Sequence, residues 1–253
     1  MAFGDVLPGR IERKWGISDW ISPERAAAAI REGDGAGVRI AVLDSGIEIG
    51  HSDFRGRELD DDLVMDDADF GQFAEGNGED VYGHGTAVAR VIWKIAPEAG
   101  ITSFRVLGPK LVGRTAQVWF AANEAIARGF DVVNCSFACG ISGHLSLYKE
   151  WTDKALLAGV HVVAASHGEE PEWPAQFASV LGVDCAEPGS LGREIHHSVG
   201  RMVEFTVAAD CDAAALMTGI VARLLSVYPI RDPLLLKALL RRVCAADKDC
   251  DNE

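Results

Sequence analysis

The sequence predicts an α/β fold in which a mostly parallel sheet carries helices on both faces. Short, strongly apolar segments alternate along the chain with longer segments of helical periodicity, which is the pattern of repeated strand–helix units. The chain of 253 residues is long enough to bury a large core. We therefore expect a layered α/β protein rather than a helical bundle or a β-sandwich.

The first elements have clear boundary signals. A helix is predicted at residues 22–33, because Ser22 and Pro23 are good starting residues and Gly33 is a good stop. VRIAVLD, residues 38–44, is a continuous apolar run that ends in Asp44 and is typical of a buried parallel strand. The acidic, Gly-rich segment 55–80 is predicted to be surface loop with a little structure.

The remaining elements alternate to the end of the chain. Strands are predicted at residues 101–107, 130–137, 160–166 and 178–185, and helices at residues 86–96, 115–129, 147–159, 213–229 and 232–246. No repeat, low-complexity tract or linker interrupts them. We expect a single domain, 1–253, with residues 1–36 as an N-terminal lead-in and residues 229–253 as a C-terminal helix and acidic tail.

Composition excludes several classes of partner. Hydrophobic residues make up 48% and charged residues 25%, as in globular proteins, and the net charge of −14 argues against a nucleic-acid partner. No signal peptide or membrane-spanning run is visible. The six cysteines lack the dense spacing of a secreted disulfide scaffold, so we expect a cytoplasmic protein with reduced thiols. The oligomeric state is left open.

Four segments carry a family resemblance. IAVLDSGIEIGHSDFRG, YGHGTAVARVI, DVVNCSFACG and VHVVAASHGEEPEWPAQFASVLGV together resemble the subtilisin-like serine peptidases, or subtilases, over roughly residues 38–228. The resemblance implies the subtilisin-like three-layer α/β fold. It also implies that Asp44 and His84 are the catalytic aspartate and histidine, and that Ser136, Phe137 and Ala138 form the strand that binds the substrate backbone. Taken alone, Asp44 reads as a structural carboxylate and His84 as a structural histidine; their order and context favour the catalytic pair.

The nucleophile position departs from the family. In subtilases a serine precedes small residues, with a glycine eight positions later; counting back from Gly219 places Cys211 there, followed by Ala213 and Ala214. His84 can accept the thiol proton and a helix N-terminus lowers a thiol pKa, whereas Asp210 and Asp212 favour the neutral thiol. Cys211 is alternatively an ordinary buried residue, or an introduced replacement for a serine.

Two further departures concern the rest of the site. Where the family carries the Gly-Asn pair of its oxyanion hole, this chain has His167 and Gly168, so that either His167 donates to the oxyanion or it is a surface-loop histidine. The segment VEFTVAA also runs almost directly into DCDAA, without the loop that shapes the active-site entrance in relatives.

Two functions remain open. The first is a peptidase or peptide acyl-transferase that uses Asp44, His84 and Cys211, and that processes a dedicated peptide precursor; the second is an inactive subtilase-fold protein that binds peptides or acts as a scaffold. The expected partner is a peptide or protein substrate. Glu169, Glu170 and Glu172 either favour basic substrate side chains or are a solvated loop. Acidic runs and the His and Cys pairs lack the spacing of calcium or zinc sites, so neither a metal nor a cofactor is expected.

Overall fold

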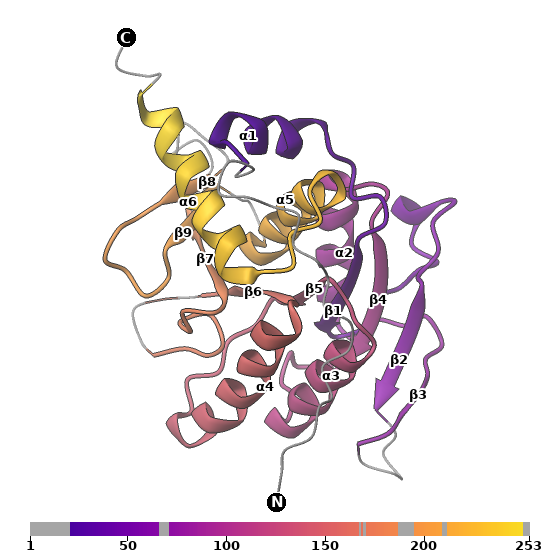
Figure 1. Cartoon of the computed structure of the whole chain (residues 1–253). Coiled ribbons are helices and arrows are strands. Elements are labelled where there is room, and N and C mark those ends of the chain that lie inside the picture. Colours follow the sequence, from indigo (N-terminus) through magenta and orange to yellow (C-terminus); the bar gives the residue numbers. More distant parts are fainter. Residues whose placement is uncertain are drawn as a thin grey trace, which may run out of the picture.

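A computed structural model describes residues 21–65, 71–166, 168, 171–186, 195–208 and 212–249. Its centre is a sheet of nine strands, in the order β3-β2-β4-β1-β5-β6-β7-β9-β8 (Figure 1). The strands are β1 (Arg39–Asp44), β2 (Asp61–Met65), β3 (Phe73–Glu75), β4 (Gly100–Arg105), β5 (Val132–Cys135), β6 (His161–Ala165), β7 (Leu181–Ala186), β8 (Ile195–His197) and β9 (Phe205–Ala208). Only the edge strands β3 and β8 pair antiparallel; the others pair parallel.

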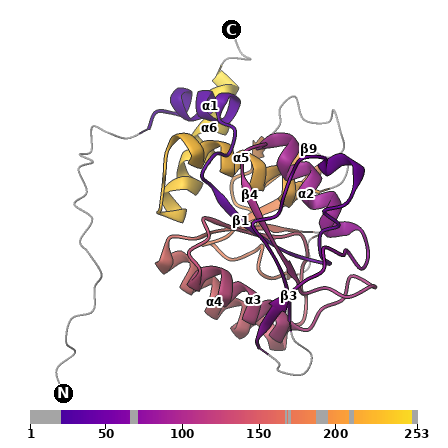
Figure 2. The same cartoon turned by 90° about the vertical axis from the view of Figure 1, so that its right-hand side faces the viewer.

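Helices cover both faces of this sheet. They are α1 (Pro23–Glu32), α2 (His84–Ile95), α3 (Thr115–Ala127), α4 (Leu145–Ala158), α5 (Ala213–Val227) and α6 (Pro233–Asp249), with short 3-10 turns at Ser52–Phe54 and Ser142–His144. Core contacts place α1, α2, α5 and α6 on one face and α3 and α4 on the other, as Figure 2 shows in side view. The predicted three-layer α/β fold is therefore confirmed.

The central strand β1 shows why the sequence adopts this arrangement. Ile40 and Val42 are buried in the core under α2 and α5, whereas Ala41 and Leu43 are buried in the core under α3 and α4. A strand that is covered on both faces requires apolar residues at every position. The burial of β1 on both faces thus explains the continuous apolar run in its sequence.

One sequence prediction was incomplete. Segment 55–80, expected to be surface loop with a little structure, contains the short strands β2 and β3, which extend the sheet beyond β4 and were not assigned from the sequence. Leu63 and Met65 of β2 are buried, and the carboxylate of Asp62 accepts a hydrogen bond from the backbone of Gly78, with 2.9 Å between Oδ2 and N. The acidic residues therefore line the edge of the sheet, and their charge concealed the alternating apolar positions. Strands β8 and β9 were not assigned from the sequence either.

Close helix packing brings two elements of the site together. Helices α2 and α5 cross at Gly219, where an added Cβ would lie 2.6 Å from Cβ of Ile95. Any larger residue would push the helices apart. This contact fixes α5 beside α2, the helix that begins with His84. No helix in the described part of the chain is long and apolar enough to cross a membrane.

Candidate functional site

Asp44 and His84 form a close pair at the carboxyl edge of the sheet. Asp44 ends β1 and is 1% exposed, and His84 is the first residue of α2. The Nδ1 atom of His84 lies 2.9 Å from Oδ1 and 3.0 Å from Oδ2 of Asp44. A buried carboxylate against Nδ1 fixes the ring orientation and the tautomer that carries its proton on Nδ1, which leaves Nε2 as the nitrogen available for proton exchange.

The backbone around this pair is held by tight turns. Gly85 donates its N–H to the Ser45 hydroxyl, and Ser45 donates its own N–H to Oδ1 of Asp44 at 2.7 Å. A Cβ added to Gly85 would lie 2.1 Å from the carbonyl oxygen of Gly46, and Gly46 itself has a φ of 106°. Glycine at these two positions lets the start of α2 approach the end of β1 closely enough for the side chains to pair.

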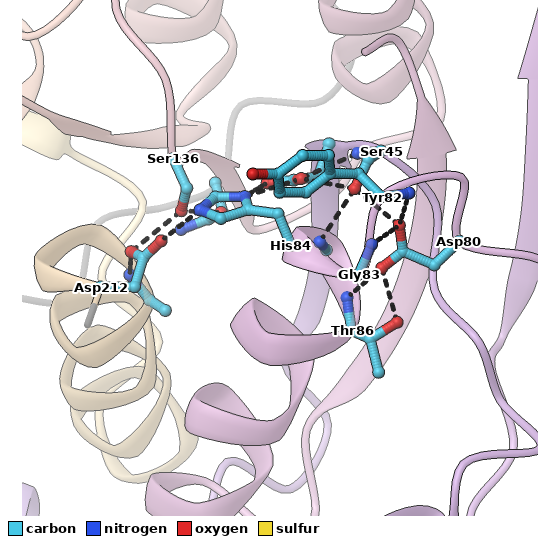
Figure 3. A network of polar contacts seen from close by, with 12 residues as sticks. Ser45, Asp80, Tyr82, Gly83, His84, Thr86, Ser136 and Asp212 are labelled. Carbon is cyan, nitrogen blue, oxygen red and sulfur yellow. Dashed lines mark hydrogen bonds and ion pairs between the residues drawn. The ribbon is translucent and has the colours of Figure 1, made fainter. Parts of the chain in front are cut away.

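Asp80 organises the start of α2 and was not identified from the sequence. Its Oδ2 accepts hydrogen bonds from the backbone N–H and the hydroxyl of Thr86, at 2.8 and 2.6 Å. Its Oδ1 accepts from the Ser45 hydroxyl at 2.7 Å and from the N–H groups of Tyr82 and Gly83 (Figure 3). An acidic residue shortly before a helix that starts with His-Gly-Thr was the available signal, because helix N-termini favour carboxylates.

Asp212 approaches the opposite side of the His84 ring. It is the N-cap of α5, and its Oδ1 accepts the N–H of Ala215 at 2.7 Å. Its Oδ2 lies 3.5 Å from Nε2 of His84. In Figure 3 Asp212 and Ser136 lie together beside the His84 ring. The sequence showed Asp212 only as a charge beside Cys211; an Asp directly before an Ala-rich helix was the signal for its capping role.

The predicted substrate-binding residues follow β5. Ser136 is buried, and its hydroxyl oxygen lies 3.0 Å from Oδ1 of Asn134 and 3.0 Å from Oδ1 of Asp212. Phe137 and Ala138 are half-buried, and with the other described residues they make no backbone hydrogen bond. Within the described part of the chain their N–H and C=O groups are therefore unpaired, as the binding of an extended peptide requires. The next residue, Cys139, already pairs with Trp173 through two backbone hydrogen bonds.

The electrostatics of the site centre on His84. The hydrogen bond to Asp44 raises the pKa of His84, and the charges of Asp44, Asp212 and Asp80 add to this effect against the opposing effect of burial. Burial raises the pKa of Asp212, opposed by the Ala215 amide, His84 and the Ser136 hydroxyl. Although burial acts against its charge, hydrogen bonds led by that of Thr86 hold the pKa of Asp80 below its ordinary value. The site therefore retains a proton on the His84–Asp212 side to higher pH than the isolated groups would.

The structure describes only some of the predicted site residues. Cys211 and His167 lie outside the described residues, as do Glu169 and Glu170. A Cβ added to Gly168 would meet no atom within 4 Å, and Glu172 accepts a hydrogen bond from the Ser166 hydroxyl just after β6. Within the described ranges no cluster of three or more His, Cys, Asp or Glu side chains is arranged to hold a metal ion.

Comparison with known proteins gives a consistent result. A model of the subtilase family matches residues 35–204, a range that includes Asp44, His84 and Ser136 and ends before β9. Subtilisin NAT of Bacillus subtilis subsp. natto is 30% identical over 198 residues, which cover 71% of this chain and 49% of that protein. The major intracellular serine protease of Bacillus subtilis is 29% identical over 199 residues, covering 71% and 59%.

A solved structure agrees with the fold. The crystal structure of a cold adapted subtilisin-like serine proteinase superposes with a TM-score of 0.67, at 22% identity and over 83% of each chain. At that identity the likeness concerns the fold. The present chain spans about half the length of the two Bacillus relatives that it matches.

Proposed function

This chain belongs to the subtilase family, and from that premise we propose that it cuts or transfers peptide bonds through Asp44, His84 and Cys211. The observation that carries the proposal is the pairing of Nδ1 of His84 with both oxygens of the buried Asp44 carboxylate. Such a pair leaves Nε2 to exchange protons with a nucleophile and a leaving group. Cys211 follows from its spacing to Gly219 and from its place just before the N-cap of α5.

The proposed reaction has two stages. His84 accepts the thiol proton of Cys211 at Nε2, and the thiolate attacks the carbonyl carbon of a peptide bond. As that C–N bond breaks, His84 returns the proton to the departing amine, and an acyl-thioester remains on Cys211. Water then releases an acid, or a second amine takes the acyl group and forms a new peptide bond. Asp44 stays ionised throughout and stabilises the imidazolium.

The substrate is a peptide segment in an extended conformation. We propose that it pairs with the open backbone groups of Phe137 and Ala138, and that Ser136 aligns this strand with α5 through its contact with Asp212. A dedicated peptide precursor is the proposed substrate class; pairing with the strand accounts for binding of its backbone and not for selection among side chains. His167 is the proposed oxyanion donor, with Gly168 beside it.

We also propose a single domain and a cytoplasmic setting with reduced thiols. Cys135 and Cys139 form no disulfide with each other or with another residue in the described part of the chain. Alkylation of the native and the urea-unfolded protein without reductant tests whether the thiols are reduced. Six modified cysteines after unfolding support reduced thiols, and fewer contradict them.

A second candidate function has its own support. Asp212 lies against Nε2 of His84, the nitrogen that the nucleophile needs, and this favours a protein that binds peptides without cutting them. The proposed substrate strand at Phe137 and Ala138 and the family membership are compatible with both functions.

Peptide turnover separates the two candidates. The purified chain is incubated with a peptide mixture beside Cys211→Ala and Cys211→Ser variants, and products are read by mass spectrometry. Cleavage or ligation by the parent protein, lost in Cys211→Ala, supports the enzyme. Turnover only by Cys211→Ser means that the cysteine silences a serine peptidase. If none of the three proteins turns over any peptide, the enzyme proposal fails, and retention of peptides on the immobilised chain becomes the test of the binding function.

A further inference from the structure

We propose that Asp212 is a positioning residue of this site, whose carboxylate holds the Nε2 side of His84 and competes there with Cys211 for the histidine. The inference rests on the proposed function, because it assigns Nε2 as the base for Cys211. Its starting point is a distance of 3.5 Å between Oδ2 of Asp212 and Nε2 of His84, which places a second carboxylate opposite Asp44.

A neutral imidazole cannot satisfy two carboxylates. Its single ring proton is held between Nδ1 and Asp44, so that its Nε2 lone pair would face the negative oxygen of Asp212. An additional proton between Nε2 and Oδ2 removes this repulsion, whichever of the two atoms carries it. While that proton is present, the Nε2 lone pair is either protonated or accepts the hydrogen bond of the Asp212 carboxyl group, and in both cases it is not available to the proton of a thiol.

Asp212 is held in this position by contacts of its own. The side chain is 9% exposed, and Oδ1 accepts the N–H of Ala215 at 2.7 Å while lying 3.0 Å from the Ser136 hydroxyl. These contacts use Oδ1 and leave Oδ2 for His84. Asp212 thus joins the first turn of α5, the start of the proposed substrate strand and the proposed base.

The surroundings of His84 contain no described positive charge that would weaken this effect. The charged groups that act on the ring from the described elements are Asp44 at the end of β1, Asp80 before α2 and Asp212 before α5. The first two support His84 from the Nδ1 side and the helix start, and among the three only Asp212 lies against Nε2.

The chemical consequence is competition between two anions. A cysteine nucleophile works as a thiolate paired with an imidazolium. Asp212 directly follows Cys211 in the chain, and its carboxylate lies against the nitrogen that the proposed mechanism assigns to the thiol proton. Removing its charge therefore both frees Nε2 and favours the thiolate, so Cys211 becomes more reactive.

The first test reads His84 directly and needs no substrate. NMR titration of the histidine ring signals is recorded for the native chain, Asp212→Asn and Asp232→Asn, with the His84 signal assigned from its loss in His84→Gln. Asp232 is a matched control, because it caps α6 with its Oδ1 in the same manner and carries no contact to His84 in the described structure. The His84 midpoint should move to lower pH in Asp212→Asn and stay unchanged in Asp232→Asn. An unchanged midpoint in folded Asp212→Asn would overturn the proposal.

The second test reads Cys211. The rate of its alkylation by iodoacetamide near neutral pH should rise about tenfold in Asp212→Asn, as expected when one nearby like charge is removed. In the His84→Gln background the same substitution should raise the rate less, because only the removal of the like charge near the thiol remains there. A rise of equal size in that background would mean simple charge repulsion at the thiol and would contradict competition for His84.

The outcomes are separable from those of the proposed function. A protein without turnover on any peptide refutes the peptidase, but the His84 titration still decides whether Asp212 holds Nε2. Conversely, turnover of peptides by the chain can occur together with a titration midpoint of His84 that is the same in Asp212→Asn as in the native chain. That result supports the proposed function and shows that Asp212 is not a positioning residue.

Discussion

The most informative stability prediction concerns Asp80, because one carboxylate joins the helix start to the Asp44–His84 pair. Asp80→Ala removes the acceptor for Thr86, Ser45 and two exposed backbone amides. A lost helix cap costs about 1 kcal/mol. A hydroxyl that loses its acceptor in a buried setting, as Thr86 does, costs about 1 kcal/mol or more.

These contributions set the expected size of the effect. The Ser45 hydroxyl retains Oδ1 of Asp44 at 3.2 Å, and the exposed amides rebind water, so we add little for them. The free energy of unfolding should fall by about 2–3 kcal/mol, which corresponds to about 1 M in the urea midpoint. Asp53→Ala is the control, because Asp53 pairs with Arg90 at an exposed site and should change stability by less than about 1 kcal/mol.

The pH dependence gives a second check on Asp80. Its pKa is lowered in the folded protein, so its contribution to stability is present above the ordinary value of 3.8 and is lost as the pH falls through the folded value. The stability difference between the native chain and Asp80→Ala should therefore narrow below about pH 4. Equal stability of Asp80→Ala and Asp53→Ala at neutral pH would refute the reasoning.

Three further predictions concern packing, a buried charge and specificity. Glu204→Gln should lower the free energy of unfolding by about 3 kcal/mol in urea titrations. The reason is that Lys237, which is 4% exposed, loses the carboxylate that lies 3.2 Å from its Nζ; a decrease below about 1 kcal/mol contradicts this prediction. Gly219→Ala should cost about 1–3 kcal/mol in thermal unfolding because its methyl group meets Ile95, and a variant as stable as the native chain would show that α2 and α5 can separate freely. If the chain cleaves peptides, Glu172→Gln should reduce any preference for Lys or Arg in the product profile, and an unchanged profile would assign Glu172 to the structural contact with Ser166.

Sequence reasoning succeeded where one physical demand dominates a segment. The apolar run before Asp44 and the stop at Gly33 each reflect one requirement: burial on two faces of the sheet in the first case and the end of a helix in the second. The order of the motifs then gave the family, which the comparisons confirmed.

Sequence reasoning was less accurate where one residue has two structural roles. Asp62 serves both the edge of the sheet and the turn at Gly78, so its charge suggested a loop although it lies in β2. Asp212 was counted as a charge on the chain next to Cys211, but the side chain of an N-cap turns back toward its own helix. Its contact with His84 depends on how α5 meets α2, over a separation that no local pattern records.

The turns that hold Asp44 and His84 form a self-contained unit. Ser45, Gly46 and Asp80 bind the end of β1 to the start of α2 with bonds that all lie within residues 44–86. None of these bonds involves a residue outside that range. Sequence changes near the proposed nucleophile Cys211 should therefore leave these bonds in place. In proteins built this way, an intact aspartate–histidine pair indicates family membership. Whether the protein is catalytically active depends on the groups that lie at Nε2 of the histidine.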